Sequence, residues 1–112
     1  MTKCNEIGTE VIKEATAAGH GKDRDSAIQD LMSKLADACT VLRKSKNLTP
    51  CKDGTGCSDN QECKDVPLIQ LPKLSTKEDL NVPVGNNKRW TAIYQGRLGC
   101  TCDCEAKPEV RP

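Results

Sequence analysis

The sequence contains very few of the large apolar residues that usually build a protein core. It has no Phe, one Trp (Trp90) and one Tyr (Tyr94). Leu, Ile and Val together make up about 18% of the chain, just under the level of about 20% that is associated with disorder. Disorder of that kind also requires a high net charge, whereas this chain has a formal net charge of +1. A folded chain of this composition therefore needs a source of stability besides its core.

Further absences exclude several classes of function. The single histidine, His20, lies between two glycines, which predicts an exposed turn rather than a catalytic site. The sequence has no Gly-x-Ser-x-Gly motif and no phosphate-binding loop, so we expect neither an enzyme nor any catalytic residue. Basic and acidic residues balance at 17 and 16, and no basic stripe with aromatic residues is present, which argues against nucleic-acid binding. No apolar run reaches the length of a transmembrane segment.

Cysteine, in contrast, is abundant, with eight residues in a chain of 112. An even number of cysteines in a short chain with a weak core predicts a disulfide framework, and each bridge stabilises a fold by about 2–4 kcal/mol. The predicted disulfide residues are Cys4, Cys39, Cys51, Cys57, Cys63, Cys100, Cys102 and Cys104. Four disulfides imply an extracytoplasmic protein, secreted or periplasmic. The segment after Met1 has no apolar signal region, so we expect a native signal peptide to have been removed.

Residues 25–45 predict a long amphipathic helix. Acidic residues lie at its start and basic residues such as Arg43 at its end, which matches the helix dipole. Asp23 or Asp25 is a candidate N-cap, and Ser26 with Gln29 fits a capping box. Apolar residues recur at spacings of three and four and form one stripe. These stripe residues are Ile28, Leu31, Met32, Leu35, Ala38, Cys39 and Leu42.

The remaining segments predict a small sheet. Residues 6–18 favour a strand, with a helix over 10–18 as the rival, and the Gly19-His20-Gly21 turn ends either element. Alternation predicts two antiparallel strands at 88–95 and 97–104, joined by a tight turn at Gly96. Residues 47–66 read as a loop. Residues 66–74 are expected to be extended, and their two prolines allow an edge strand or a polyproline path but not a central strand. Residues 75–88 form a polar connection.

These elements predict an α+β fold in which one amphipathic helix packs on a small antiparallel sheet of three or four strands. The order is β-α-β-β-like, and a disulfide-anchored loop covers residues 47–74. We expect residues 1–112 to form a single domain of which 1–4 and 105–112 are frayed.

The spacing of the last three cysteines constrains their pairing. On a strand, Cys100, Cys102 and Cys104 point to one face with neighbours about 7 Å apart, too far to bond each other. We expect them to bond the three cysteines of the 47–66 loop. A Cys4–Cys39 bridge would complete the set, and a bond from Cys39 to the last strand is the alternative.

Two other functions remain open. The Cys-x-Cys-x-Cys motif resembles the closely spaced cysteines of metallothioneins and suggests a protein that binds zinc or copper. The absence of a Cys-x-x-Cys motif, in contrast, favours disulfides and no bound metal. Trp90 and Tyr94 share one strand face, where they either pack in the core or form a stacking surface for a ligand. The strand–helix–strands order is similar in topology to dodecins, small flavin-binding oligomers with a tryptophan on a strand. That similarity implies a small-ligand or flavin-type binder.

The leading prediction is a non-catalytic extracytoplasmic module with an interaction or structural role and no cofactor. Its partner would be another protein or an extracellular ligand. The prolines and charged residues at 64–89 are the predicted binding surface.

Overall fold

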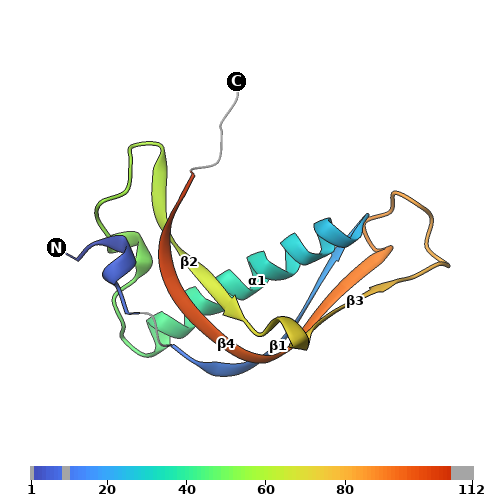
Figure 1. Cartoon of the computed structure of the whole chain (residues 1–112), viewed down its shortest axis with the longest axis horizontal. Helices are drawn as coiled ribbons and strands as arrows, with labels where there is room; N and C mark the ends of the chain where they lie inside the picture. The colour runs from blue at the N-terminus through green and yellow to red at the C-terminus, as the bar shows by residue number, and fades with distance from the viewer. Residues whose placement is uncertain (1, 9–10, 107–112) are drawn as a thin grey trace.

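The computed structural model describes residues 2–8 and 11–106. One long helix packs across the concave face of an antiparallel sheet that curls around it (Figure 1). The elements are β1 (Lys13–Gly21), α1 (Arg24–Ser45), β2 (Gln61–Ile69), β3 (Leu74–Glu78) and β4 (Trp90–Ala106), with short 3-10 turns η1 (Cys4–Glu6), η2 (Cys51–Asp53) and η3 (Leu71–Lys73). Four disulfides cross-link these elements. The predicted α+β class, with a helix on a small antiparallel sheet, is confirmed.

Strand β4 is the centre of the sheet. On one side it pairs with β1 over residues 90–98, and on the other side with β3 over 90–94 and then with β2 over 98–106. Strands β2 and β3 therefore lie one after the other along the same edge. Of the two paths predicted for the proline-containing segment, the structure has the edge strand, although β2 begins at Gln61, inside the expected loop.

The expected turn at Gly96 is wrong, because β4 is one continuous strand of 17 residues. Gly96 pairs with Ala15 of β1, and on its other side the partner changes from β2 to β3. Here η3 passes so close that a Cβ atom on Gly96 would lie 2.9 Å from the side chain of Lys73. The even-numbered residues from Trp90 to Cys104 all share one face. This unbroken parity could have identified a single strand from the sequence.

Tyr94 compensates for the gap between β2 and β3. Its hydroxyl donates a hydrogen bond to the Arg97 carbonyl and accepts one from the Gln70 backbone N–H, at 2.9 Å. The Gln70 side-chain oxygen in turn accepts a hydrogen bond from the Arg97 N–H at 3.1 Å. These bonds satisfy backbone groups that the interrupted ladder would leave unpaired.

Helix α1 agrees with the predicted range of 25–45 to within one residue. Its N-cap is Asp23, whose carboxylate accepts a hydrogen bond from the Ser26 N–H at 2.7 Å. That bond lowers the pKa of Asp23 below its usual value. Ser26 itself lies inside the helix, so the expected Ser26–Gln29 capping box is wrong. After the helix, Asn47 adopts a positive φ of 56° and the Leu48 N–H bonds the Arg43 carbonyl, which closes the C-terminus.

Strand β1 begins seven residues later than expected and includes the Gly19-His20-Gly21 segment, which is not a turn. Both glycines are buried against α1, whereas His20 is exposed. A Cβ atom on Gly19 would lie 2.5 Å from the Ala27 carbonyl oxygen and 2.7 Å from the Leu31 Cα. Only glycine therefore allows the strand to approach the helix this closely.

Replacing Gly19 with alanine is accordingly expected to destabilise the protein by about 3 kcal/mol, because the added methyl group overlaps helix backbone rather than a flexible side chain. Gly8→Ala is the matched control, since nothing lies within 4 Å of a Cβ at Gly8. Urea denaturation of both variants would measure the difference. A Gly19→Ala protein as stable as Gly8→Ala would contradict the close approach.

The free edge of β1 is covered by two charged side chains of α1. Asp30 accepts a hydrogen bond from the His20 N–H at 2.9 Å, and Lys34 donates to the Ala18 carbonyl at 3.0 Å. The two side chains also form an ion pair at 3.3 Å. The His20 N–H holds the pKa of the Asp30 carboxyl below its usual value. Charges on an edge oppose pairing with another strand, so this part of β1 is protected from aggregation.

The two chain ends are more ordered than expected. Cys4 is buried and disulfide-bonded, and Glu105 and Ala106 pair with Glu62 and Gln61 of β2. The fraying predicted for 1–4 and 105–112 is therefore wrong for these three residues. Met1 and residues 107–112 lie outside the described residues.

Candidate functional site

All eight cysteines form disulfides. The pairs are Cys4–Cys63, Cys39–Cys100, Cys51–Cys102 and Cys57–Cys104. Two of the three expected bonds from the loop to the last strand are present, but Cys63 bonds Cys4 instead, so the third is wrong. The expected Cys4–Cys39 bridge is also wrong, because α1 lies over β4 and brings Cys39 to Cys100, which was the alternative. Cys4 instead enters a second small core at the other end of the sheet, where η1 packs beside Cys63.

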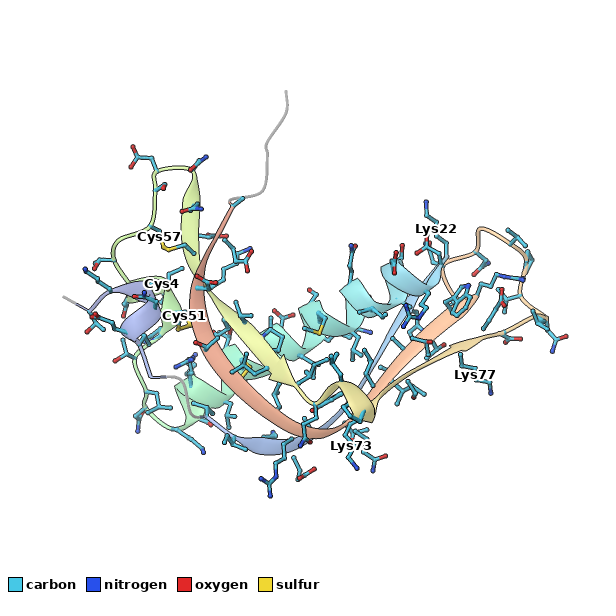
Figure 2. All side chains as sticks on the ribbon, viewed as in Figure 1. Cys4, Lys22, Cys51, Cys57, Lys73 and Lys77 are labelled. Carbon is cyan, nitrogen blue, oxygen red and sulfur yellow. A yellow bond between two sulfur atoms is a disulfide. The ribbon has the colours of Figure 1, made fainter. Side chains whose placement is uncertain are left out.

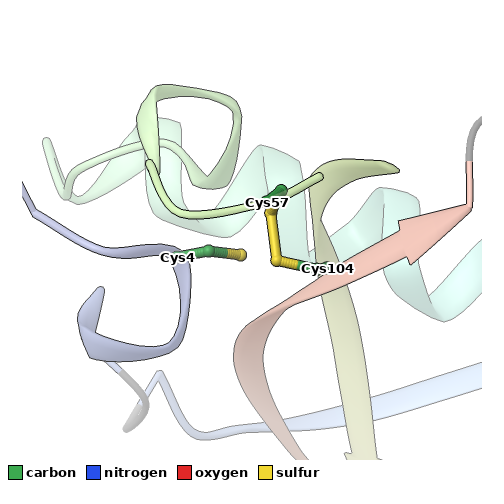
Figure 3. A group of neighbouring side chains, drawn as sticks. All are labelled: Cys4, Cys57 and Cys104. Atoms are coloured by element: carbon green, nitrogen blue, oxygen red, sulfur yellow. A yellow bond between two sulfur atoms is a disulfide. The ribbon is translucent and has the colours of Figure 1, made fainter. Parts of the chain in front are cut away.

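Two groups of potential metal ligands occur among the described residues. The sulfurs of Cys4, Cys57 and Cys104 lie within 4.8 Å of one another (Figure 3), and Cys51 and Cys102 group with Asp65. Every one of these sulfurs is part of a disulfide. Metal ions bind thiolates, so this oxidised form offers no thiolate ligand at either group.

Tyr94 and Trp90 do not form an open stacking surface. Tyr94 is fully buried (0% exposed) and its hydroxyl is used within the sheet, as described above. Trp90 is half-buried and packs against the same core. Tyr94 is therefore a core residue and cannot stack on a ligand, which corrects the idea of a shared binding surface.

A groove of about 860 Å³ lies between the C-terminal half of α1, η2 and the start of β2. Its wall contains the buried ion pair between Arg43 and Asp65, whose Nε and Oδ1 atoms are 2.6 Å apart. Arg43 also donates to the Gly8 carbonyl at 2.8 Å, and Thr40 donates to the second Asp65 oxygen at 2.9 Å. These contacts join helix, strand and N-terminal segment, which is a structural role.

The burial of Arg43 (1% exposed) was not expected, since the sequence placed it only among the basic residues that match the helix dipole at the end of α1. The sequence did contain a signal. Arg43 lies four residues after Cys39 and eight after Leu35, so it continues the buried stripe by one more turn. Its partner Asp65 lies two residues after Cys63 on β2, so both side chains point to the inward face of the strand.

The connection between β3 and β4 forms the most exposed apolar feature. We call residues 79–88 the apical loop; it extends from the end of the sheet opposite the Cys57 disulfide, as Figures 1 and 2 show. Its neck is closed by Arg89, which pairs with Glu78 at 2.9 Å and donates to the Val82 carbonyl at 2.6 Å. The Asp79 N–H also bonds the Arg89 carbonyl at 2.7 Å.

Hydrogen bonds within the apical loop hold its backbone in shape. The Val82 N–H bonds the Asp79 carbonyl and the Asn86 N–H bonds the Pro83 carbonyl, both at 3.1 Å. Despite this order, Leu80 and Val84 are 76% and 84% exposed. The sequence predicted a polar connection over residues 75–88, so the exposure of Leu80 and Val84 was not expected.

The chain was compared with protein-family models, with curated proteins and with solved structures, and none of the three comparisons finds a match. Among the described residues, neither α1 nor any shorter helical turn has the length and apolar character needed to cross a membrane.

Proposed function

We propose that this protein is a non-catalytic, extracytoplasmic interaction module that binds another protein through its apical loop. The observation that carries the proposal is the exposure of Leu80 and Val84 on a loop whose neck and backbone are hydrogen-bonded. The four disulfides support an oxidising compartment, because disulfides persist there and are reduced in the cytosol.

The energetics favour a binding role for these two side chains. Full burial of one aliphatic side chain stabilises a complex by about 1.5–3 kcal/mol. A loop that is already ordered loses little conformational entropy when it binds, so more of that free energy appears as affinity.

The shape of the loop indicates the partner. Leu80 and Val84 lie four residues apart around Pro83 and project from a narrow loop. A partner with an aliphatic recess on its surface would bury these two exposed side chains. Asn81, Asn86 and Asn87 supply polar groups for the rim, which is the usual composition around an apolar interface centre.

Site-specific photocrosslinking tests the proposal. A photoreactive residue at position 80 or 84, in protein added to the extracytoplasmic fraction of its own source, is expected to form one discrete adduct. A photoreactive residue at Val41, which is 67% exposed on α1, is the matched control and should form none. Unlabelled native protein should compete for the adduct, and the Leu80→Asp/Val84→Asp variant should not. Equal adducts from the loop and from position 41, or equal competition by the variant, would refute a role for the apical loop.

A further inference from the structure

Figure 3 shows the sulfur of Cys4 beside the Cys57–Cys104 disulfide, and Cys4 itself belongs to a second disulfide, with Cys63. Cys4 Sγ, from the Cys4–Cys63 bond, lies within 4.8 Å of both sulfurs of the Cys57–Cys104 bond. The strand register explains this proximity, because Cys63 of β2 pairs directly with Cys104 of β4. Two disulfides thus start from opposite positions on neighbouring strands.

The two bonds differ in their access to solvent. Cys57 and Cys104 are half-buried, whereas Cys4 and Cys63 are only 2% and 7% exposed. The cysteines of the other two disulfides are also buried. A thiol in solution can therefore reach Cys57–Cys104 most readily, and this outer bond lies against the inner one.

We propose that this cluster is a thiol–disulfide exchange site whose substrate is a dithiol. In the first step the dithiol reduces the Cys57–Cys104 bond; two electrons pass to the protein, which gains two thiols, and the dithiol becomes a cyclic disulfide. In the second step the Cys104 thiolate attacks Cys4 Sγ. A Cys4–Cys104 bond forms, the Cys4–Cys63 bond breaks, and Cys63 leaves as a thiolate that takes up a proton.

The second step needs little movement. Cys63 and Cys104 are opposite each other in the ladder, so Cys4 can change from one to the other without changing its own position greatly. The attacking group must be a thiolate, and exchange proceeds through sulfur–sulfur attack of this kind. The result transfers the covalent link of the N-terminal segment from β2 to β4. This activity is independent of the apical loop, which lies at the other end of the sheet (Figure 1).

Partial reduction of the native protein tests the exchange. The protein is treated with one molar equivalent of dithiothreitol without oxygen, then quenched in denaturant with N-ethylmaleimide and mapped by peptide mass spectrometry. The label is expected on Cys57 and Cys63, together with a peptide that contains a Cys4–Cys104 bond. Label on Cys57 and Cys104 with the Cys4–Cys63 bond intact would overturn the proposal.

A variant removes the need for a reductant. In Cys57→Ala, Cys104 has a permanent free thiol, and the label is expected to be divided between Cys104 and Cys63. Cys100→Ala is the matched control, because it leaves Cys39 as a free thiol in the other core, where the label should stay on Cys39 alone. Label confined to Cys104 in the Cys57→Ala protein would show that the inner bond is not attacked.

Discussion

Replacing Arg43 with leucine is expected to lower the free energy of unfolding by about 3–5 kcal/mol, the usual cost of leaving a buried charge without its partner. The Asp65 side chain is only 5% exposed, and in this variant Thr40 is the remaining side chain bonded to its carboxylate. The Gly8 carbonyl would also lose its donor. Urea denaturation followed by circular dichroism would measure the loss.

The double variant Arg43→Leu/Asp65→Leu separates the charge from the packing. Because it removes both charges and keeps apolar volume, it is expected to recover most of the stability that Arg43→Leu loses, in line with other buried pairs. If the double variant were as unstable as Arg43→Leu alone, the ion pair would not be the cause, and packing of the arginine side chain would be.

The second large effect concerns the Cys39–Cys100 disulfide. Its sequence separation is 61 residues, but the remaining Cys51–Cys102 bond shortens the loop that it closes to about 15 residues, for which the chain-entropy model gives about 3 kcal/mol. Both cysteines are fully buried in the main core, so Cys39→Ala/Cys100→Ala also leaves a small cavity. We expect this variant to be less stable for two reasons: its unfolded chain has more conformational entropy, and its core is less well packed.

The Cys57→Ala/Cys104→Ala variant is the matched control. The same Cys51–Cys102 bond shortens its loop to about 10 residues, which gives a similar loss of chain entropy, but its cysteines are half-buried. Thermal and urea denaturation should therefore show Cys39→Ala/Cys100→Ala to be less stable than the control by about 1–2 kcal/mol, the share due to packing. Equal losses would mean that the core closes around the missing sulfurs.

Part of the fold could be predicted because it depends on local pattern. The stripe of α1 and the alternation along β4 are read from residues a few positions apart, and helix and strand geometry convert such spacings directly into faces. The inward face shared by Cys100, Cys102 and Cys104 follows from the same period of two. The small core and the number of cysteines likewise predicted that disulfides would support the fold.

Other features depend on which segments meet. Gly96 suggests a turn by itself, and only the close passage of η3 beside it explains why a glycine lies within a continuous strand. Gly19 also suggests a turn until the backbone of α1 is placed against it. The burial of Arg43 depends on Asp65, which is 22 residues away in sequence.

The sequence predicted the range of α1, the residues on the inward face of β4 and the need for disulfides. Each of these follows from composition or from neighbours along the chain. The disulfide partners, the buried ion pair and the exposure of Leu80 and Val84 could be known only from the folded structure. These depend on contacts between distant segments, and many pairings of eight cysteines satisfy the same local pattern.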